Sequence, residues 1–129
     1  MRVGDIMSVK VETIPASATL DEARERMWRR NIRHLAVVES GALVGVVSRD
    51  GLERAKGPSV REAISGPAVT ATPHTTIREA ANLMRGNRVD SLPVLDAQAD
   101  VVGIVTVSDL LDLIGKGVDR APEDPGRRR

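Results

Sequence analysis

Two hydroxyls and a carboxylate stand within one turn of each other in the stretch Thr106-Val-Ser-Asp109. The stretch follows the apolar run VVGIV and precedes LLDLI, so a strand is expected to end and a helix to begin here. The free amides and positive dipole end of a helix N-terminus favour a phosphate, and a carboxylate in the first turn can accept hydrogen bonds from both hydroxyls of a ribose. The stretch therefore predicts a nucleotide site, with a capping box, [ST]-x-x-[DE], as the alternative.

The first half of the sequence carries a near-copy of this region, LVGVVSRDGL at 43–52 against VVGIVTVSDL at 101–110. Gly51 stands where the later copy has Asp109, and a glycine cannot hold a ribose. The aspartate has moved to Asp50, which is one residue, or about 100° of helix, away. The difference predicts that the two places have diverged, with one ligand site per chain.

Catalytic groups are scarce elsewhere in the sequence. It has no cysteine, which excludes disulfides, thiolate catalysis and cysteine zinc sites and is compatible with a reducing compartment. Its two histidines, His34 and His74, stand in unmatched places and form no nucleophile–base pair or metal-ligand spacing. His34 fits a packed strand residue, and His74 fits a solvent-exposed loop. We therefore expect no enzyme, no metal and no required cofactor.

Composition narrows the class of protein. The 129 residues are 41% hydrophobic and almost wholly aliphatic, because Trp28 is the only aromatic residue. A chain of this size fits one compact domain, or two small units that share a core. No apolar run approaches the roughly 20 residues that span a bilayer, so we expect a cytoplasmic protein with no membrane partner. A net charge of +1 argues against a strongly basic nucleic-acid binder.

The chain consists of two copies of one unit. Matched residues of the two copies lie 57 positions apart before the turn 39–43 and 58 positions apart after it. The matching turn of the second copy, 96–101, has one residue more. A turn is the place where an inserted residue costs least. Only two copies occur, which indicates a pseudo-symmetric pair. The matched residues are Leu20 and Ile77, Ala23 and Ala80, Met27 and Met84, Val37 and Val94, and Gly45 and Gly103.

Each copy has the pattern strand, helix, strand, turn, strand, helix. Capping boxes at Thr19 and Thr76 predict helices that begin near 20 and 77, and Gly86-Asn87 marks the end of the second. The runs 35–38 with 42–47, and 92–95 with 101–107, predict two hairpins. These strands are apolar at nearly every position, so both faces must be covered, and we expect copy to pack on copy.

The predicted fold class is α/β in the α+β sense, with two pseudo-symmetric β-α-β-β-α units packed through their sheets. The expected boundaries are 1–56 for the first unit and 60–115 for the second, joined by KGPS at 56–59. Residues 116–129 are polar and rich in proline and glycine towards their end, and are expected to form a disordered tail.

The ordered set of motifs resembles the cystathionine β-synthase (CBS) domain, twice over. The set comprises Asp5-Ile6-Met7 with Glu62-Ala63-Ile64, the helix starts TLDEA and TIREA, the strands LAV and LPV, and a Gly-x-Val-[Ser/Thr] strand. The resemblance covers residues 3 to about 115 and implies a stand-alone Bateman-type pair with two clefts. In this family such clefts commonly bind AMP, ADP, ATP, S-adenosylmethionine or NAD(H), so the resemblance implies a non-catalytic regulatory module with an adenosyl ligand as effector.

The resemblance also implies which residues form each cleft. In the second cleft, Asp90 takes the position that Arg33 has in the first. Its negative charge would oppose a phosphate there. The first cleft is expected to hold Val9, Lys10 and Val11 along the adenine, Arg33 and His34 near the phosphates, and Ile104, Thr106, Ser108 and Asp109 at the strand end and ribose. The second, weaker cleft is expected to hold Ser48, Asp50 and Gly51 with Ala68, Val69, Thr70, Asp90 and Ser91.

Paired CBS domains often meet as flat dimers, so the resemblance implies a homodimer that signals by conformational change to a separate effector protein. We expect Trp28 and the face around Met27 and Met84 near the contact. The alternative is a ligand-free dimerisation or nucleic-acid module that uses the basic cluster Arg26, Arg29, Arg30 and Arg33. Such clusters are usually solvated faces balanced by nearby acids, here Asp21, Glu22 and Glu25.

Overall fold

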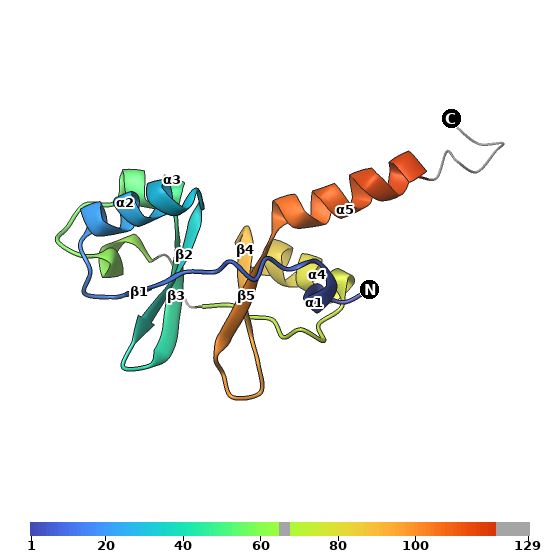
Figure 1. Cartoon of the computed structure of the whole chain (residues 1–129), viewed down its shortest axis with the longest axis horizontal. Helices are drawn as coiled ribbons and strands as arrows, with labels where there is room; N and C mark the ends of the chain where they lie inside the picture. The colour runs from blue at the N-terminus through green and yellow to red at the C-terminus, as the bar shows by residue number, and fades with distance from the viewer. Residues whose placement is uncertain (65–67, 121–129) are drawn as a thin grey trace.

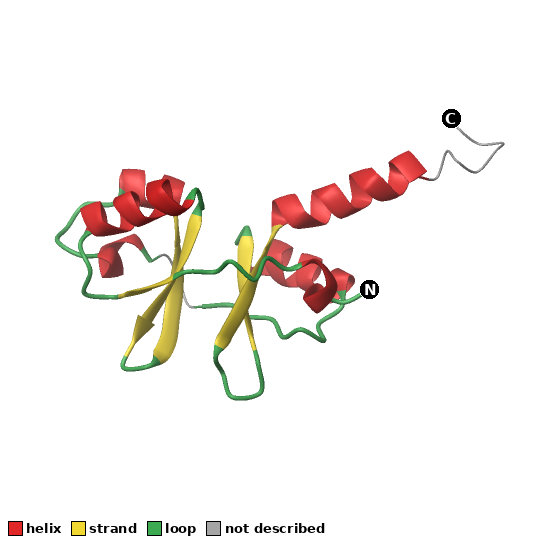
Figure 2. Cartoon of the chain, viewed as in Figure 1, coloured by secondary structure: helices red, strands yellow, loops and turns green. Residues whose placement is uncertain are grey.

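Two β-hairpins lie in the middle of the molecule, and helices flank them (Figure 1, Figure 2). The structure is a computed structural model that describes residues 1–64 and 68–120. Its elements, in chain order, are α1 (Val3–Ile6), β1 (Thr13–Pro15), α2 (Leu20–Arg30), β2 (His34–Glu39), β3 (Ala42–Ser48), α3 (Arg49–Arg54), the 3-10 turn η1 (Val60–Ala63), α4 (Ile77–Asn87), β4 (Ser91–Leu95), β5 (Val101–Thr106) and α5 (Val107–Arg120).

Reciprocal capping boxes start the two matched helices, α2 and α4, as the sequence predicts. The Thr19 hydroxyl accepts a hydrogen bond from the Glu22 amide at 3.0 Å, and the Glu22 carboxylate accepts one from the Thr19 amide at 3.1 Å. The Thr76 and Glu79 pair repeats this arrangement at 3.0 and 2.8 Å. Two amides at each helix start, which have no partner within the helix, are satisfied in this way.

Both matched helices end on a residue in the left-handed conformation. Asn31 after α2 has φ 55°, and Arg88 after α4 has φ 57°. The predicted stop at Gly86-Asn87 is confirmed to within a residue, since Gly86 lies inside α4 and Asn87 is its last residue. These two caps turn the chain from each helix directly into the first strand of the hairpin that follows.

The hairpins are antiparallel and have matched registers. Ser48 pairs with His34 in the first, Thr106 pairs with Ser91 in the second, and each has one register shift, after Val37 and after Val94 respectively. β1 adds a parallel third strand to the first hairpin. In the described part of the second half, the strand that would match β1 is reduced to a single bridge between Ala71 and Val94. The last strand, β5, was expected to reach residue 107 and ends at Thr106.

The opening segment of each copy packs in the other half. Val3 donates its amide to the Thr75 carbonyl at 2.8 Å, and Val60, 57 residues later, donates to the Ala18 carbonyl at 2.8 Å. Figure 1 shows the consequence, because α1 lies beside α4 and the chain then crosses the molecule to reach β1. The two units are contiguous in sequence but exchange their first turns in space.

Each half has its own hydrophobic core, completed by the exchanged segment. Val60 is fully buried in the first core, among residues of α2, β2 and β3, and Val3 is fully buried in the second, among residues of α4, β4 and β5. Two close approaches fix this packing. A Cβ atom on Gly45 would lie 2.6 Å from Ile64, and one on Gly103 would lie 2.6 Å from Met7, so neither position has room for a side chain.

The last helix extends into the segment that was expected to be disordered. α5 continues to Arg120, so residues 116–120 are helical rather than disordered. Residues 121–129 of the expected tail lie outside the described residues. No helix in the described part of the chain is long and apolar enough to span a membrane.

Candidate functional site

The first cleft is a cavity of about 500 Å³ that both halves of the molecule line. All the residues predicted for it lie in its wall except Val9 and Asp109. The residues that line it are Ser8, Lys10, Val11, Asn31, Ile32, Arg33, His34, Asp90, Ile104, Thr106, Val107 and Ser108.

Backbone pairing between the halves positions the wall formed by residues 8–11. The Ser8 amide donates to the Ile104 carbonyl, and the Ile104 amide donates to the Ser8 carbonyl, each at 2.9 Å. This pair holds Lys10 and Val11 alongside the end of β5. Val9 points away, since 71% of its surface is exposed.

Asp109 forms the capping box that the sequence left as the alternative to ribose binding. Its Oδ2 accepts a hydrogen bond from the Thr106 amide at 2.8 Å, and its own amide donates to Thr106 Oγ1 at 3.2 Å. The carboxylate thus lies at the start of α5, next to Ser108 in the cleft wall. A ribose at this position would have to be held by the remaining oxygen, Oδ1.

The second cleft is a cavity of about 430 Å³, and residues of both halves line it as well. Ser48, Asp50, Val69 and Ser91 line it as predicted, whereas Thr70 does not. The Ser48 hydroxyl accepts a hydrogen bond from the Gly51 amide at 3.0 Å, so it caps α3. The complete lining is His34, Val46, Ser48, Asp50, Gly51, Arg54, Ala63, Ala68, Val69, Arg88, Val89, Asp90, Ser91 and Pro93.

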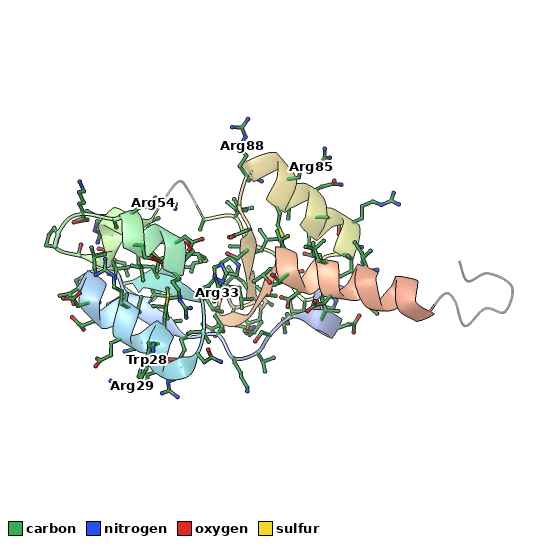
Figure 3. The ribbon with its side chains drawn as sticks, turned by 90° about the horizontal axis from the view of Figure 1, so that it is seen from above. Trp28, Arg29, Arg33, Arg54, Arg85 and Arg88 are labelled. Atoms are coloured by element: carbon green, nitrogen blue, oxygen red, sulfur yellow. The ribbon has the colours of Figure 1, made fainter. Side chains whose placement is uncertain are left out.

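Two arginines in the second cleft were missed by the sequence analysis. Arg54 comes from α3 and Arg88 from the residue after α4, so opposite halves contribute them (Figure 3). The repeat offered a signal for Arg88, because it lies 57 residues after Asn31, which lines the first cleft. These side chains place positive charge beside the carboxylates of Asp50 and Asp90, so the second cleft has no single sign of charge.

His34 and Asp90 line both clefts, which therefore share one wall. His34 Nε2 lies 3.5 Å from Asp90 Oδ1, and the contact joins the first half to the second. The backbone reinforces this placement. The Arg33 carbonyl accepts a hydrogen bond from the Arg49 amide, and the Asp90 carbonyl accepts one from the Val107 amide, each at 2.9 Å. Asp90 is thereby bonded to the first residue of α5, and Arg33, which precedes His34, is bonded to the first residue of α3.

Acidic side chains offset the positive charge of the basic cluster at the end of α2. Arg29 lies 3.2 Å from Glu25, and Arg26 and Arg30 each lie 3.9 Å from Glu12. Glu12 supplies a counter-charge that the sequence analysis did not anticipate. Arg33 belongs to the first cleft and lies near the middle of the molecule, away from Arg29 (Figure 3). Neighbouring acids thus offset the cluster, as expected for a solvated face.

The face expected at a dimer contact is only partly available. Trp28 is 82% exposed, which leaves a large apolar side chain in solvent. Met27 and Met84, however, are buried in the two cores and cannot reach another chain. His74 is exposed in a loop, as predicted. Within residues 1–64 and 68–120, no group of three or more histidine, aspartate or glutamate side chains gathers that could hold a metal ion.

Among curated proteins, the chain is 34% identical over 115 residues to the CBS domain-containing protein YhcV of Bacillus subtilis, covering 84% of this chain and 81% of that one. It is also 31% identical over 121 residues to a homoserine O-acetyltransferase of Methanohalophilus mahii, covering 91% of this chain. The chain spans only about a quarter of the length of that enzyme and of several other curated relatives.

Solved structures share the fold. The CBS domain pair of protein MJ0100, in complex with 5′-methylthioadenosine and S-adenosyl-L-methionine, matches with a TM-score of 0.83 and 28% identity over 91% of this chain and 98% of that one. The cytosolic domain of the Mg²⁺ channel MgtE, in complex with ATP, matches with a TM-score of 0.74 and 30% identity over 87% of this chain and 48% of that one.

The family model for the CBS domain matches residues 3–56 and again residues 60–116. The repeat, the matched hairpins and capped helices, and the α+β fold of the solved neighbours agree with this result. The chain therefore belongs to the CBS domain family, as a tandem pair of CBS domains.

Proposed function

We propose that this CBS pair is a non-catalytic regulatory module that binds an adenosine-containing ligand in the first cleft. The observation that carries the proposal is that one cavity of about 500 Å³ brings together predicted residues from three separate parts of the chain. These parts are the connection containing Lys10, the start of β2 with Arg33, and the junction of β5 and α5 at Thr106 and Ser108. The residues themselves pointed to the Thr106–Asp109 stretch, and the family resemblance implied the other two parts.

The chemistry of the wall suits a phosphorylated nucleoside. Lys10 and Arg33 supply two cations against the one carboxylate of the wall, Asp90, and Ser108 in the first turn of α5 brings the positive end of that helix to the same wall, which together favour a phosphate. Val11 and Ile104 offer apolar surface for a base. Asp109, with Oδ1 available, would receive the ribose hydroxyls. Two solved relatives that bind 5′-methylthioadenosine, S-adenosyl-L-methionine or ATP support an adenosyl ligand for this fold.

Signalling would follow from the position of the ligand between the halves. A ligand that contacts Lys10, Arg33 and Thr106 binds best at one relative orientation of the two cores, so it shifts the population towards that orientation. We propose that a separate effector protein responds to this shift, and that the chain acts as a homodimer with Trp28 at the contact. A cytoplasmic location fits both the adenine nucleotide and the absence of cysteine.

The test is a thermal-shift titration with AMP, ADP, ATP, S-adenosylmethionine and NADH on wild type and Asp109→Ala. A ligand at a hundredfold excess over its Kd adds about 2.7 kcal/mol, which is a shift of several degrees in Tm. Glu79→Ala is the matched control, because it removes the same kind of capping carboxylate from α4, away from both clefts.

Three outcomes separate the roles. If a ligand stabilises wild type and Glu79→Ala but not Asp109→Ala, Asp109 holds the ribose. If Asp109→Ala and Glu79→Ala both lose basal stability and both keep the full ligand shift, Asp109 is only a helix cap and binding depends on the rest of the wall. If none of the five ligands shifts wild type, the proposed function is wrong.

A further inference from the structure

In the described part of the chain, most of the large apolar side chains that are exposed lie on two helices, one in each half. Trp28 on α2 is 82% exposed, and on α5 Leu111 is 62% and Ile114 is 59% exposed. Val107, which is also exposed, completes the α5 face (Val107, Leu111 and Ile114), because these positions recur at helical spacing. Apolar side chains gathered on one helix face, unlike scattered ones, mark an interaction surface.

Trp28 borders a groove between α2 and α3, with a volume of about 250 Å³. This groove is smaller than the roughly 300–1,000 Å³ of small-molecule pockets, so it suits a side chain of another protein better than a ligand. An exposed indole beside a groove is also a typical anchor of a protein–protein contact. The other residues that line the groove are Arg24 and Met27 of α2 and Arg49, Leu52 and Glu53 of α3.

The repeat relates the Trp28 region to the α5 face. Trp28 matches Arg85 of α4 at a spacing of 57 residues, and Arg49 and Glu53 of α3 match Val107 and Leu111 of α5 at a spacing of 58. α2 packs on α3 as α4 packs on α5, so matched residues occupy equivalent places in the two halves. At these positions the first half combines an apolar α2 with a charged α3, and the second half combines a charged α4 with an apolar α5.

The order of the helices decides which of them meet when two copies associate. Figure 1 shows α2, α3 and α5 on the side of the molecule away from the hairpin turns. Seen from that side in Figure 3, α2 lies below α3 in one half, and α5 lies below α4 in the other. A two-fold dimer that joins like halves through this side would place α2 on α3 and α4 on α5 of the second copy. A dimer that joins unlike halves would place α2 on α5 and α3 on α4.

Only the dimer of unlike halves matches apolar surface to apolar surface and opposite charges to each other. It places Trp28 over Leu111 of the second copy and brings Glu53 towards its Arg85. The dimer of like halves would set Trp28 against Arg49 and Glu53, and Arg85 against the apolar α5 face. Apolar contact lowers the free energy of association, whereas covering a charged group without a partner raises it.

We propose that two copies of this chain associate with unlike halves together, so that Trp28 of each copy packs on the α5 face of the other. Each contact is then made twice around one two-fold axis, so the assembly closes as a dimer. The inference rests on the proposed function, which includes a homodimer with Trp28 at the contact, and it adds the surface that Trp28 meets.

Disulfide cross-linking tests the arrangement directly, because the chain has no cysteine of its own. Glu25 on α2 and Asn82 on α4 are matched positions, and both are exposed. An equimolar mixture of the variants Glu53→Cys and Asn82→Cys should form a covalent mixed dimer on mild oxidation, since α3 of one copy meets α4 of the other. The control mixture of Glu53→Cys and Glu25→Cys should not, since it reports α3 against α2.

Trp28 also reports the contact by its fluorescence, because no other aromatic residue is present. As the wild-type dimer forms with rising concentration, the emission should shift to shorter wavelength. Leu111→Asp should weaken dimerisation, measured by sedimentation velocity, by more than about tenfold and abolish the shift, because it would cover an unpaired carboxylate. Leu111 is exposed, so this change leaves the cores intact. Asp112→Asn is the matched control, since this exposed neighbour lies about 100° around the helix from Leu111.

The outcomes separate the inference from the proposed homodimer. A dimer that cross-links in the Glu25 mixture, that fails to cross-link in the Asn82 mixture, or that Leu111→Asp leaves intact overturns the inference and leaves the homodimer standing. Sedimentation as open polymers overturns the inference as well, because the contacts then do not close around a two-fold axis. A chain that stays monomeric overturns both, while the thermal-shift titration tests ligand binding independently.

Discussion

Gly103 is the position at which a single added methyl group should disturb both the fold and the first cleft. A Cβ there would lie 2.6 Å from Met7 Sδ and 2.9 Å from the Ser8 carbonyl oxygen. The methionine sulfur can move aside, but the backbone oxygen cannot move without breaking the reciprocal Ser8–Ile104 pair, whose two hydrogen bonds are each 2.9 Å long. Those bonds hold Lys10 and Val11 in the cleft wall.

The magnitude follows from these contacts. Overpacking of this kind costs about 1–3 kcal/mol, and each lost backbone hydrogen bond costs about 1 kcal/mol, so we expect Gly103→Ala to lie near the upper end of that range. For a chain of this size, at about 4 °C per kcal/mol, the Tm should fall by roughly 10 °C. If Lys10 loses one charge-assisted hydrogen bond to a phosphate, AMP binding weakens by about tenfold or more.

The assay pairs urea denaturation with AMP titration of the folded protein, and Gly45→Ala serves as the control. Gly45 is the matching glycine of the first half, and its added Cβ would meet Ile64 at 2.6 Å, beside the second cleft. It should therefore also destabilise the fold but leave AMP binding at the first cleft near wild type. Equal AMP affinities for the two variants would refute the claim that the Ser8–Ile104 pairing builds the first cleft.

Two further predictions concern stability. Val3→Ala and Val60→Ala each truncate a fully buried side chain of an exchanged segment, so each should lower the free energy of unfolding by about 2 kcal/mol. Urea denaturation should still show one cooperative transition, and a separate transition for each half would contradict the exchange. The hydrogen bonds donated by the amide and hydroxyl of Thr76 lower the pKa of Glu79 below 4.5, so Glu79 stabilises the fold above that pH and the contribution is lost as the pH falls through the lowered pKa. Thermal melts between pH 3 and 7 should accordingly show a smaller acid loss of Tm for Glu79→Gln than for wild type, and parallel pH profiles would exclude this role.

The local elements were predictable because their causes are local. Thr19 and Thr76 each satisfy a helix start with a carboxylate three residues away, so the boxes identify α2 and α4 from the sequence alone. The hairpins follow from two short apolar runs around a polar turn. The polar, proline- and glycine-rich composition of 116–129 predicted disorder from residue 116, whereas α5 continues to Arg120.

Part of the candidate site was also predictable, through the repeat and the family pattern. These located Lys10, Arg33 and Thr106, which the structure brings to one cavity. Arg54 and Arg88 were missed, because whether a long side chain at the end of a helix reaches a cleft depends on the neighbouring half. Val9 was assigned to the wall but is 71% exposed and does not line the cavity, because the direction of its side chain depends on how the chain runs after the Ser8–Ile104 pair.

The sequence by itself determined the two-copy architecture, the helix starts, the hairpins and the difference between Gly51 and Asp109, because each is written in neighbouring residues or in a fixed spacing. The tertiary structure alone decided which half receives each opening segment. An apolar turn such as Val3–Ile6 suits either core equally by composition, and only backbone pairing with Thr75 and Ile104 selects the other half. The contact between His34 and Asp90 was likewise decided by the tertiary structure, because it joins two segments far apart in the sequence that no local pattern brings together.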